Sequence, residues 1–471
     1  MTTYISTRGK AAHAGFTGAM MAGLASDGGL YVPQSCPILS AEDCANLQHQ
    51  SYVEAAWRVL APFVGQDIDG TVLARLLQRA YKNFDAPQVA PVSVLEDGHF
   101  MLELYHGPTL AFKDVALQFL GHCFTHVLAQ SGRKVTIVGA TSGDTGSAAI
   151  AAFANQPNVD IVILHPKGRV SDVQRRQMTT VDAPNVHNIA VEGDFDDCQN
   201  MVKAMFADEV FRTDIGLSAI NSINWARIAA QVVYYVTTAI KVKAQTGSAA
   251  AFVVPTGNFG NIYAGYVARA MGAPVGRLVA ATNRNDILYR FFAEGQMKRH
   301  AVEPSLSPSM DIQVASNFER LLFDLFDQQG DAVDQTMRHF AQGGTFKLDD
   351  TLMAEVRKTF GGGRCSDEQT LATINNVYET TGRLIDPHTA VGVHVARAYR
   401  QRYPDQPVVT LATAHAAKFP DAVMQATGVM PPVPAQLAGL EDKPERCTTL
   451  PCDLAAVQKH IRAAVGGKAG A

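Results

Sequence analysis

The stretch Lys134-Val-Thr-Ile-Val-Gly-Ala-Thr-Ser-Gly-Asp-Thr-Gly-Ser-Ala-Ala-Ile-Ala-Ala-Phe153 decides the fold class. Its first residues, Lys134 to Val138, form a short β-branched run that is typical of a buried strand. A Gly-rich loop follows, and the Ala-rich segment from Ser147 to Phe153 is typical of a helix. Strand, loop and helix in this order predict one βα unit of a parallel sheet.

The same alternation recurs further along the chain. More strands are predicted over Asp160–Leu164, Val186–Val191, Ala250–Val254, Arg277–Ala281 and Pro407–Leu411. Helices are predicted over Ser171–Thr180, Asp194–Ala207, Trp225–Ala244 and a stretch that ends at Met271. Strands that alternate with helices predict doubly wound parallel sheets, and the second group of strands predicts a second α/β layer.

The chain length predicts more than one core. At 471 residues the chain exceeds the size at which a single core stops growing, so two or three subdomains are expected. Residues 1 to about 90 combine a turn signal at Asp27-Gly28-Gly29 with a helix-period stretch from Ala41 to Val64, which predicts a separate N-terminal layer. Later breaks are predicted at the Gly-rich Phe360–Arg364 and the Pro-rich Met430–Pro434.

Composition excludes several classes of function. Hydrophobic residues make up 47% and charged residues 18% of the chain, and no apolar run is long enough to span a bilayer. The net charge of -4, without a basic stripe, argues against nucleic acid as a partner. The seven cysteines have no zinc-ligand spacing, so we expect reduced thiols and no metal site. Since the first residues also lack a secretory signal, we expect a cytoplasmic protein.

A Gly-rich loop, Val254-Pro-Thr-Gly257-Asn258-Phe259-Gly260-Asn261, lies between a predicted strand and a predicted helix. Backbone N–H groups and the positive end of the helix dipole can converge there on one anion. The loop lacks the Lys and Ser/Thr of a P-loop and the spacing of a dinucleotide fingerprint, so the phosphate should not belong to a magnesium-bound nucleotide. The alternative is a plain βα turn whose glycines serve only backbone geometry.

A lysine in Glu103-Leu-Tyr-His-Gly-Pro-Thr-Leu-Ala-Phe-Lys113-Asp114 follows an apolar Leu-Ala-Phe run and precedes a predicted helix. Schiff-base chemistry needs a neutral amine, which burial and a positive helix end both favour. The alternative for Lys113 taken alone is an ordinary exposed lysine.

Eight stretches together resemble threonine synthase in its longer form, a fold-type II enzyme that uses pyridoxal 5'-phosphate (PLP). They are Tyr4-Ile-Ser-Thr-Arg-Gly, Asp27-Gly-Gly-Leu-Tyr-Val-Pro, His106-Gly-Pro-Thr-Leu-Ala-Phe-Lys-Asp, Thr141-Ser-Gly-Asp-Thr-Gly, Asn221-Ser-Ile-Asn-Trp-Ala-Arg, Gly257-Asn-Phe-Gly-Asn, Ser309-Met-Asp-Ile-Gln-Val and Asp386-Pro-His-Thr-Ala-Val-Gly. The resemblance covers most of the chain. One departure is Ala416, where the family usually has Pro.

The resemblance implies a role for each matched residue. Lys113 would carry PLP as a Schiff base, and Thr413 would place its hydroxyl against the pyridine nitrogen. The cofactor phosphate would be held by Gly257, Asn258, Phe259, Gly260 and Asn261. The substrate carboxylate would lie at Thr141, Ser142, Asp144 and Thr145, and the substrate phosphate at Asn221, Ser222 and Arg227. The role of Asp144 stays open, because its carboxylate would repel a bound carboxylate unless it is turned away or protonated.

The resemblance also implies a fold like that of the tryptophan synthase β chain, with two doubly wound α/β domains and an N-terminal subdomain. The expected division is residues 1–90 for the N-terminal subdomain, 91–130 with 221–430 for the large PLP-binding domain, 131–220 for the small domain and 431–471 for a C-terminal extension.

The implied reaction converts O-phospho-L-homoserine and water into L-threonine and phosphate, in a monomer or homodimer. The alternatives are a related lyase acting on a phosphorylated hydroxy-amino acid, and a non-catalytic module that binds PLP or a phosphate ligand.

Overall fold

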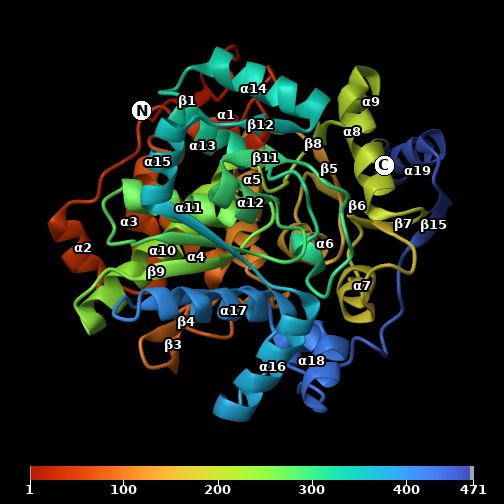
Figure 1. The fold of residues 1–471 in the computed structure, drawn as a ribbon. Coiled ribbons are helices and arrows are strands. Elements are labelled where there is room, and N and C mark those ends of the chain that lie inside the picture. The colour runs from red at the N-terminus through yellow and green to blue at the C-terminus, as the bar shows by residue number, and fades with distance from the viewer. Residues whose placement is uncertain (1, 467–471) are drawn as a thin grey trace.

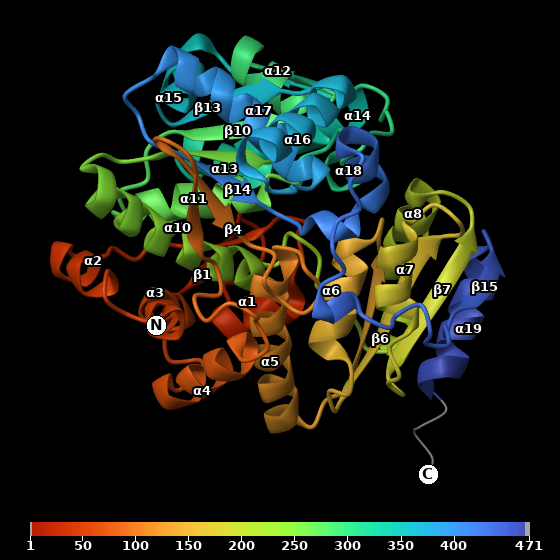
Figure 2. The ribbon, with the colours of Figure 1, turned by 90° about the horizontal axis from the view of Figure 1, so that it is seen from below.

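The computed structural model describes residues 2–466. A mostly parallel sheet of six strands and a parallel sheet of five lie in separate parts of the molecule, and the N-terminal residues form a third, mostly helical part. Figure 2 shows the five-stranded sheet at the right, the six-stranded sheet at the top, helix α5 (Lys113–Ser131) at the bottom centre and helix α6 (Asp144–Phe153) between α5 and the five-stranded sheet. Figure 1 shows the same chain from the side.

The smaller sheet contains the βα unit predicted at residues 134–153. Its five strands, in spatial order, are β15 (Thr448–Pro451), β7 (Val186–Glu192), β6 (Val159–Pro166), β5 (Val135–Ala140) and β8 (Leu217–Ser218), all parallel. Every residue of β6 is buried, as expected for a strand covered on both faces. The predicted strands at 134–138, 160–164 and 186–191 are confirmed.

Five helices belong to this sheet. They are α6, α7 (Asp172–Thr179), α8 (Phe195–Ala207), α9 (Glu209–Asp214) and α19 (Leu454–Gly466). The predicted helices at 171–180 and 194–207 are confirmed. Residues 448–466, which the sequence placed in a C-terminal extension, add the edge strand β15 beside β7 and the helix α19 against α8. The Pro-rich segment from Met430 to Pro434 has neither helix nor strand, as predicted.

The larger sheet lies under the predicted phosphate loop. Its strands, in spatial order, are β13 (Phe360–Arg364), β10 (Leu278–Thr282), β9 (Ala251–Pro255), β14 (Val408–Ala412), β4 (His99–Glu103) and β3 (Val92–Glu96). All neighbours are parallel except the hairpin pair β3 and β4. The strands predicted at 250–254, 277–281 and 407–411 are confirmed.

The predicted Gly-rich break at Phe360–Arg364 is wrong, because these residues form β13 in parallel register with β10. Helices α12 (Ile287–Glu294) and α17 (Pro387–Arg402) approach this strand. A Cβ added to Gly363 would lie 2.5 Å from Val395 Cγ1 on α17, and one added to Gly362 would lie 3.2 Å from the backbone of Tyr289 on α12. The glycines therefore permit close packing of helices on an edge strand.

The remaining elements surround the larger sheet. Its other helices are α10 (Trp225–Thr246), α11 (Gly260–Ala270), α13 (Phe318–Leu325), α14 (Gly330–Gly343), α15 (Asp350–Thr359), α16 (Asp367–Thr381) and α18 (Pro420–Thr427). The small hairpin of β11 (Gln296–Lys298) and β12 (Thr345–Lys347) and the short 3-10 turns η1 (Pro308–Met310), η2 (Ala416–Lys418) and η3 (Ala435–Leu437) complete the set. Within residues 2–466, no helix has the length and apolar character that crossing a membrane requires.

The N-terminal part packs on α10. It contains β1 (Tyr4–Ser6), α1 (Phe16–Ala22), β2 (Tyr31–Pro33), α2 (Ala41–Leu47), α3 (Tyr52–Val64) and α4 (Gly70–Tyr81). The helix-period stretch from Ala41 to Val64 is divided into two helices because Ser51 caps the start of α3 in a capping box with Glu54. Side chains from this part and from the larger sheet join one continuous hydrophobic core.

Candidate active site

Three segments from different parts of the fold meet around one lysine. Lys113 is the first residue of α5, and its Nζ lies 3.2 Å from Asp144 Oδ2 at the start of α6 and 3.5 Å from Ser309 Oγ on η1. The lysine is 7% exposed. Burial lowers the pKa of Lys113; the charge of Asp144 opposes this shift and that of Lys418 adds to it. The prediction that Lys113 is buried and able to lose its proton agrees with this setting.

Asp144 bridges two lysines. Its Oδ1 lies 2.9 Å from Lys418 Nζ and accepts a hydrogen bond of 2.8 Å from Gln174 Nε2, while Oδ2 faces Lys113. Burial alone would raise the pKa of Asp144, but Lys113 and Lys418 hold it well below its ordinary value. The carboxylate is turned toward two cations, and both favour its ionised form.

The loop between β9 and α11 has the backbone of an anion site. Phe259 has a φ of 63°, in the left-handed region, and its buried ring packs 5.2 Å from the ring of Phe318. A Cβ added to Gly257 would lie 3.0 Å from Ser309 O, and one added to Gly260 would lie 3.1 Å from Asn317 Nδ2. These close approaches leave no room for side chains, so the loop presents backbone at the start of α11.

Asn261 supplies a buried donor that no protein group uses. Its Oδ1 accepts hydrogen bonds from Tyr234 OH at 2.6 Å and Tyr235 OH at 3.0 Å, which fixes the orientation of the amide. The Nδ2 atom is buried and has no hydrogen-bond partner among residues 2–466. A buried donor without an acceptor is costly, so a ligand is expected to accept from it.

Thr413 lies beside the lysine, at the end of β14. Its carbonyl accepts from Phe112 N–H at 2.9 Å, and its own N–H donates to Thr389 Oγ1 at 3.2 Å. The residue is buried, and within the described chain its hydroxyl makes no hydrogen bond. The hydroxyl is therefore free for a ligand, as its predicted role requires.

The 141–146 loop follows β5 and begins α6. Thr141 Oγ1 accepts from Gly143 N and Gly146 N, both at 2.9 Å, so this hydroxyl orders the loop itself. Ser142 and Thr145 are half-buried. The loop thus offers two side-chain hydroxyls and a helix start beside the Lys113 and Asp144 pair.

Arg227 is a buried guanidinium without a counter-ion. Its Nη1 donates to Ile220 O at 3.1 Å, its Nε is buried without a partner, and no carboxylate of residues 2–466 forms an ion pair with it. Burial lowers the pKa of Arg227 to about 10, so the group stays charged at neutral pH. Of its predicted companions, Ser222 is half-buried and Asn221 is exposed. The guanidinium is therefore the strongest of the three as an anion ligand.

Four further residues belong to this site: Gln174, Ser309 and His388, to which the sequence gave no role, and Lys418, whose closeness to Thr413 in the sequence allowed it to titrate in the site but gave it no assigned role. His388 Nε2 accepts from Ser309 N–H at 3.3 Å and Nδ1 donates to Asp386 Oδ1 at 2.9 Å, which fixes one tautomer. Ser309 and His388 lay in stretches that carried the family resemblance, but nothing in their spacing pointed to Lys113.

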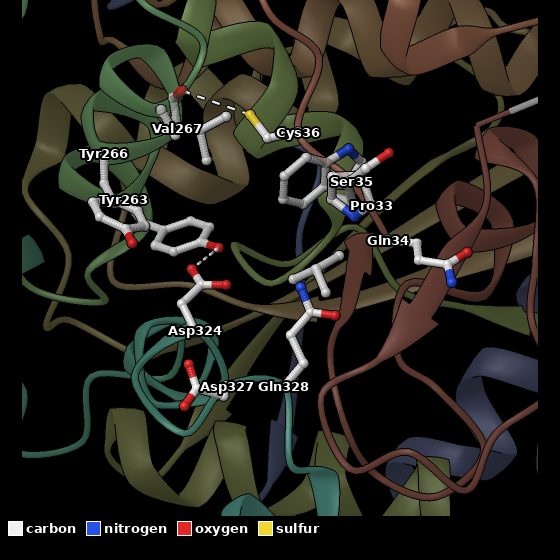
Figure 3. Close-up of a pocket in the computed structure, with 13 residues that line it drawn as sticks. Pro33, Gln34, Ser35, Cys36, Tyr263, Tyr266, Val267, Asp324, Asp327 and Gln328 are labelled. Carbon is white, nitrogen blue, oxygen red and sulfur yellow. Dashed lines mark hydrogen bonds between the residues drawn. The ribbon is translucent and has the colours of Figure 1, made fainter.

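A pocket lies away from Lys113 and the residues around it. Figure 3 shows this pocket of about 420 Å³, lined by residues that include Cys36, Tyr263, Asp324 and Asp327. Tyr263 OH donates to Asp324 Oδ2 at 3.3 Å. None of the predicted site residues lines this pocket.

The donor set fits PLP. Asn261 Nδ2 and the backbone of the 257–261 loop offer donors to a phosphate, the buried Lys113 offers an amine to an aldehyde, and the buried Thr413 offers a hydroxyl to a ring nitrogen. No other group is needed to explain why this loop is narrow and why its amide lacks a partner.

Comparison with known proteins gives the same result. Three family models match: "Threonine synthase N terminus" at residues 3–81, "Pyridoxal-phosphate dependent enzyme" at 94–342 and "Threonine synthase, C-terminal" at 389–461. The threonine synthase of Pseudomonas aeruginosa is 53% identical over 459 residues, covering 97% of each chain.

Solved structures agree over the full length. A PLP-bound threonine synthase from Brucella melitensis has a TM-score of 0.95 at 49% identity, covering 99% of this chain and 100% of that one. Yeast threonine synthase has a TM-score of 0.93 at 36% identity, covering 99% of each chain. The chain therefore belongs to the threonine synthase family of PLP-dependent fold-type II enzymes.

Proposed function

We propose that Lys113 is the Schiff-base lysine of this chain. We also propose that one of two anion sites beside it binds the cofactor phosphate and the other binds the substrate phosphate. The observation that carries the proposal is a buried amine accompanied by unfilled donors on two different elements, Asn261 on α11 and Arg227 on α10. A substrate with one phosphate and a cofactor with another require two such sites. The reaction is O-phospho-L-homoserine plus water to L-threonine plus phosphate.

The cofactor is held by the loop after β9. Backbone groups of Gly257, Asn258, Phe259 and Gly260, with Asn261 Nδ2, bind its phosphate. The hydroxyl of Thr413 would serve as a neutral partner for the pyridine nitrogen. When bound, PLP supplies an electron-withdrawing ring that takes up negative charge from the substrate carbons.

The substrate is held from two sides. Ser142 and Thr145, in a loop ordered by Thr141, receive the α-carboxylate, and Asp144 sets the local charge through the lysines. Arg227, with Ser222 and Asn221, holds the substrate phosphate and stabilises it as it leaves Cγ.

Lys113 then moves protons. With substrate in the site, the neutral Nζ of Lys113 would take a proton from Cα and would act as acid and base at Cβ, where water adds. Burial favours the neutral amine, because it lowers the cost of losing the proton.

The test measures phosphate, L-threonine and 2-oxobutyrate in parallel after the purified protein, with PLP, meets O-phospho-L-homoserine. Equal amounts of phosphate and threonine, both lost in Lys113→Ala, are expected. Phosphate with 2-oxobutyrate would instead identify a lyase, and no turnover would identify a binding module.

We further propose that the protein works in the cytoplasm as a monomer or homodimer. The seven cysteines are all free, including the exposed Cys447 and Cys452, and unpaired thiols suit a reducing compartment. Light scattering on the purified holoenzyme would distinguish a monomer from a dimer.

A further inference from the structure

A second buried lysine lies in the site, and the reaction as proposed above does not use it. Lys418, on η2, is 0% exposed. Its Nζ lies 2.9 Å from Asp144 Oδ1 and donates to Thr109 O at 2.7 Å. A fully buried ammonium is costly unless it is paired and hydrogen-bonded, and here both conditions are met.

The contacts of Lys418 join three parts of the site. Asp144 begins α6 of the smaller sheet, whereas Lys418 follows β14 of the larger sheet. Thr109 precedes Lys113 by four positions, and its N–H and hydroxyl donate to Asp114 at 2.8 Å and 2.6 Å. Lys418 therefore ties the 141–146 loop to the segment that carries Lys113.

The charges around Lys113 give this arrangement a chemical consequence. The groups whose charges act most strongly on Lys113 and Asp144 are Asp144 on α6, Lys418 on η2, Arg227 on α10 and His388 on α17. Lys418 also acts on the buried carboxylate of Asp114, next to Lys113 in the chain. Asp144 is the one carboxylate among the four groups that act most strongly. If it faced Lys113 alone, its whole charge would hold the proton on that amine.

We propose that Lys418 is a positioning residue: it balances the charge of Asp144, so that the nitrogen of Lys113 gives up its proton readily and the 141–146 loop accepts an anionic carboxylate. This inference rests on the proposed role of Lys113. It assigns a function to a side chain that touches neither phosphate site, and it explains why an ionised carboxylate is tolerated where the substrate carboxylate is expected.

The test uses the pH dependence of the visible absorption band of the holoenzyme, which reports the protonation of the Lys113 nitrogen without any turnover. Lys418→Met removes the cation at similar length and should move the midpoint of the band up by about one pH unit or more. Asp144→Asn should move it down. The double variant should lie near the unaltered protein, because both charges are gone.

Two controls separate charge from structure. Lys418→Arg keeps the cation and should restore most of the midpoint, and Lys358→Met changes an exposed lysine on α15 and should move nothing. If Lys418→Met does not fold, the downward shift in Asp144→Asn still tests the charge balance.

Midpoints that stay unchanged in Lys418→Met and Asp144→Asn would overturn the inference. The failure of the proposed role of Lys113 looks different, since the unaltered protein would then show no PLP band, and the failure of the proposed reaction would show as 2-oxobutyrate or no turnover with the band present.

Discussion

The two βα loops of the site have the same topology and opposite electrostatics. The 257–261 loop after β9 has no charged side chain, and its donors are backbone groups and one amide. The 141–146 loop after β5 contains Asp144, which is ionised between Lys113 and Lys418. One loop leaves its donors unfilled for an anion, whereas the other carries an anion of its own and needs two cations to balance it.

The difference shows how one supersecondary unit can serve two ligands. A phosphate brings strong negative charge and needs only aligned N–H groups at a helix start. A substrate that must react with an amine needs a controlled charge around that amine, and the lysines and Asp144 supply it. The following predictions test whether the two loops are distinct in this sense.

The largest effect is expected from Lys113→Ala, which leaves both loops intact and removes the amine between them. Turnover should fall by about 10⁴-fold or more, because no other residue can replace a covalent amine. Threonine and phosphate release measure it, with Lys358→Ala as a control at an exposed site. Substantial remaining activity would mean that the loops and not Lys113 carry the chemistry.

Next comes a pair of buried arginines. All three guanidinium nitrogens of Arg320 donate hydrogen bonds, to Tyr31 O, Ile223 O and Asn317 Oδ1. Arg227 donates one, to Ile220 O. Arg227→Met should lower kcat/KM by about 10²–10³-fold with little loss of stability, because it removes a positive charge that would bind substrate phosphate but pairs with no carboxylate of residues 2–466. Arg320→Met should instead lower the free energy of unfolding by about 2–4 kcal/mol.

Urea unfolding and steady-state kinetics of both arginine variants make the comparison. Equal losses of stability in the two variants, without a selective loss of activity for Arg227→Met, would show that Arg227 is structural as well.

A smaller effect is expected from placing a carboxylate in the uncharged loop. Asn261→Asp keeps the shape and replaces the unfilled donor Nδ2 with an oxygen, so at pH 8 PLP affinity should fall by about 100-fold through like-charge repulsion. Asn188→Asp is the matched control, since that buried amide donates to Met178 O in the smaller sheet. Titration of the apoprotein with PLP measures both, and unchanged affinity in Asn261→Asp would remove the distinction between the loops.

The smallest effect concerns Asp324, a half-buried carboxylate. Burial raises the pKa of Asp324 from 3.8 to about 6, in contrast to Asp144. Since the folded state then holds the proton more tightly than the unfolded chain, stability is lost as the pH rises through this interval. Asp324→Asn should therefore be more stable than the unaltered protein at pH 7, by about 3 kcal/mol, and nearly equal to it near pH 4.

Urea unfolding at the two pH values checks this prediction. Asp327→Asn, an exposed carboxylate of the same pocket, should change stability at neither pH. A gain for Asp324→Asn that is the same at both pH values would contradict the charge explanation.

The sequence predicted the strands that carry both loops, because β5, β6, β9 and β14 are runs of β-branched residues that only a buried strand accommodates. It failed at β13, where glycines that normally interrupt a strand permit helices to pack closely. The division into domains stays a prediction, with 467–471 of the C-terminal extension outside the described residues.

Within the site, local motifs identified Lys113 and the phosphate loop, but not the partner of Asp144. Lys418 follows a different strand in a different sheet, so its contact depends on how the two sheets are arranged in space. The motif shows only the neighbours of Asp144 in the chain, so it could not predict that its carboxylate faces two lysines.

The edge strand β15 also determines when the five-stranded sheet can be completed during synthesis on the ribosome. Strand β7 can pair with β6 early, but its other edge stays open until Thr448–Pro451 emerge, after every strand of the larger sheet has been made. An open edge of a hydrophobic strand can pair with another nascent chain. A message that ends before residue 448 would therefore yield a protein with its PLP loop and lysine present but with a tendency to aggregate through β7.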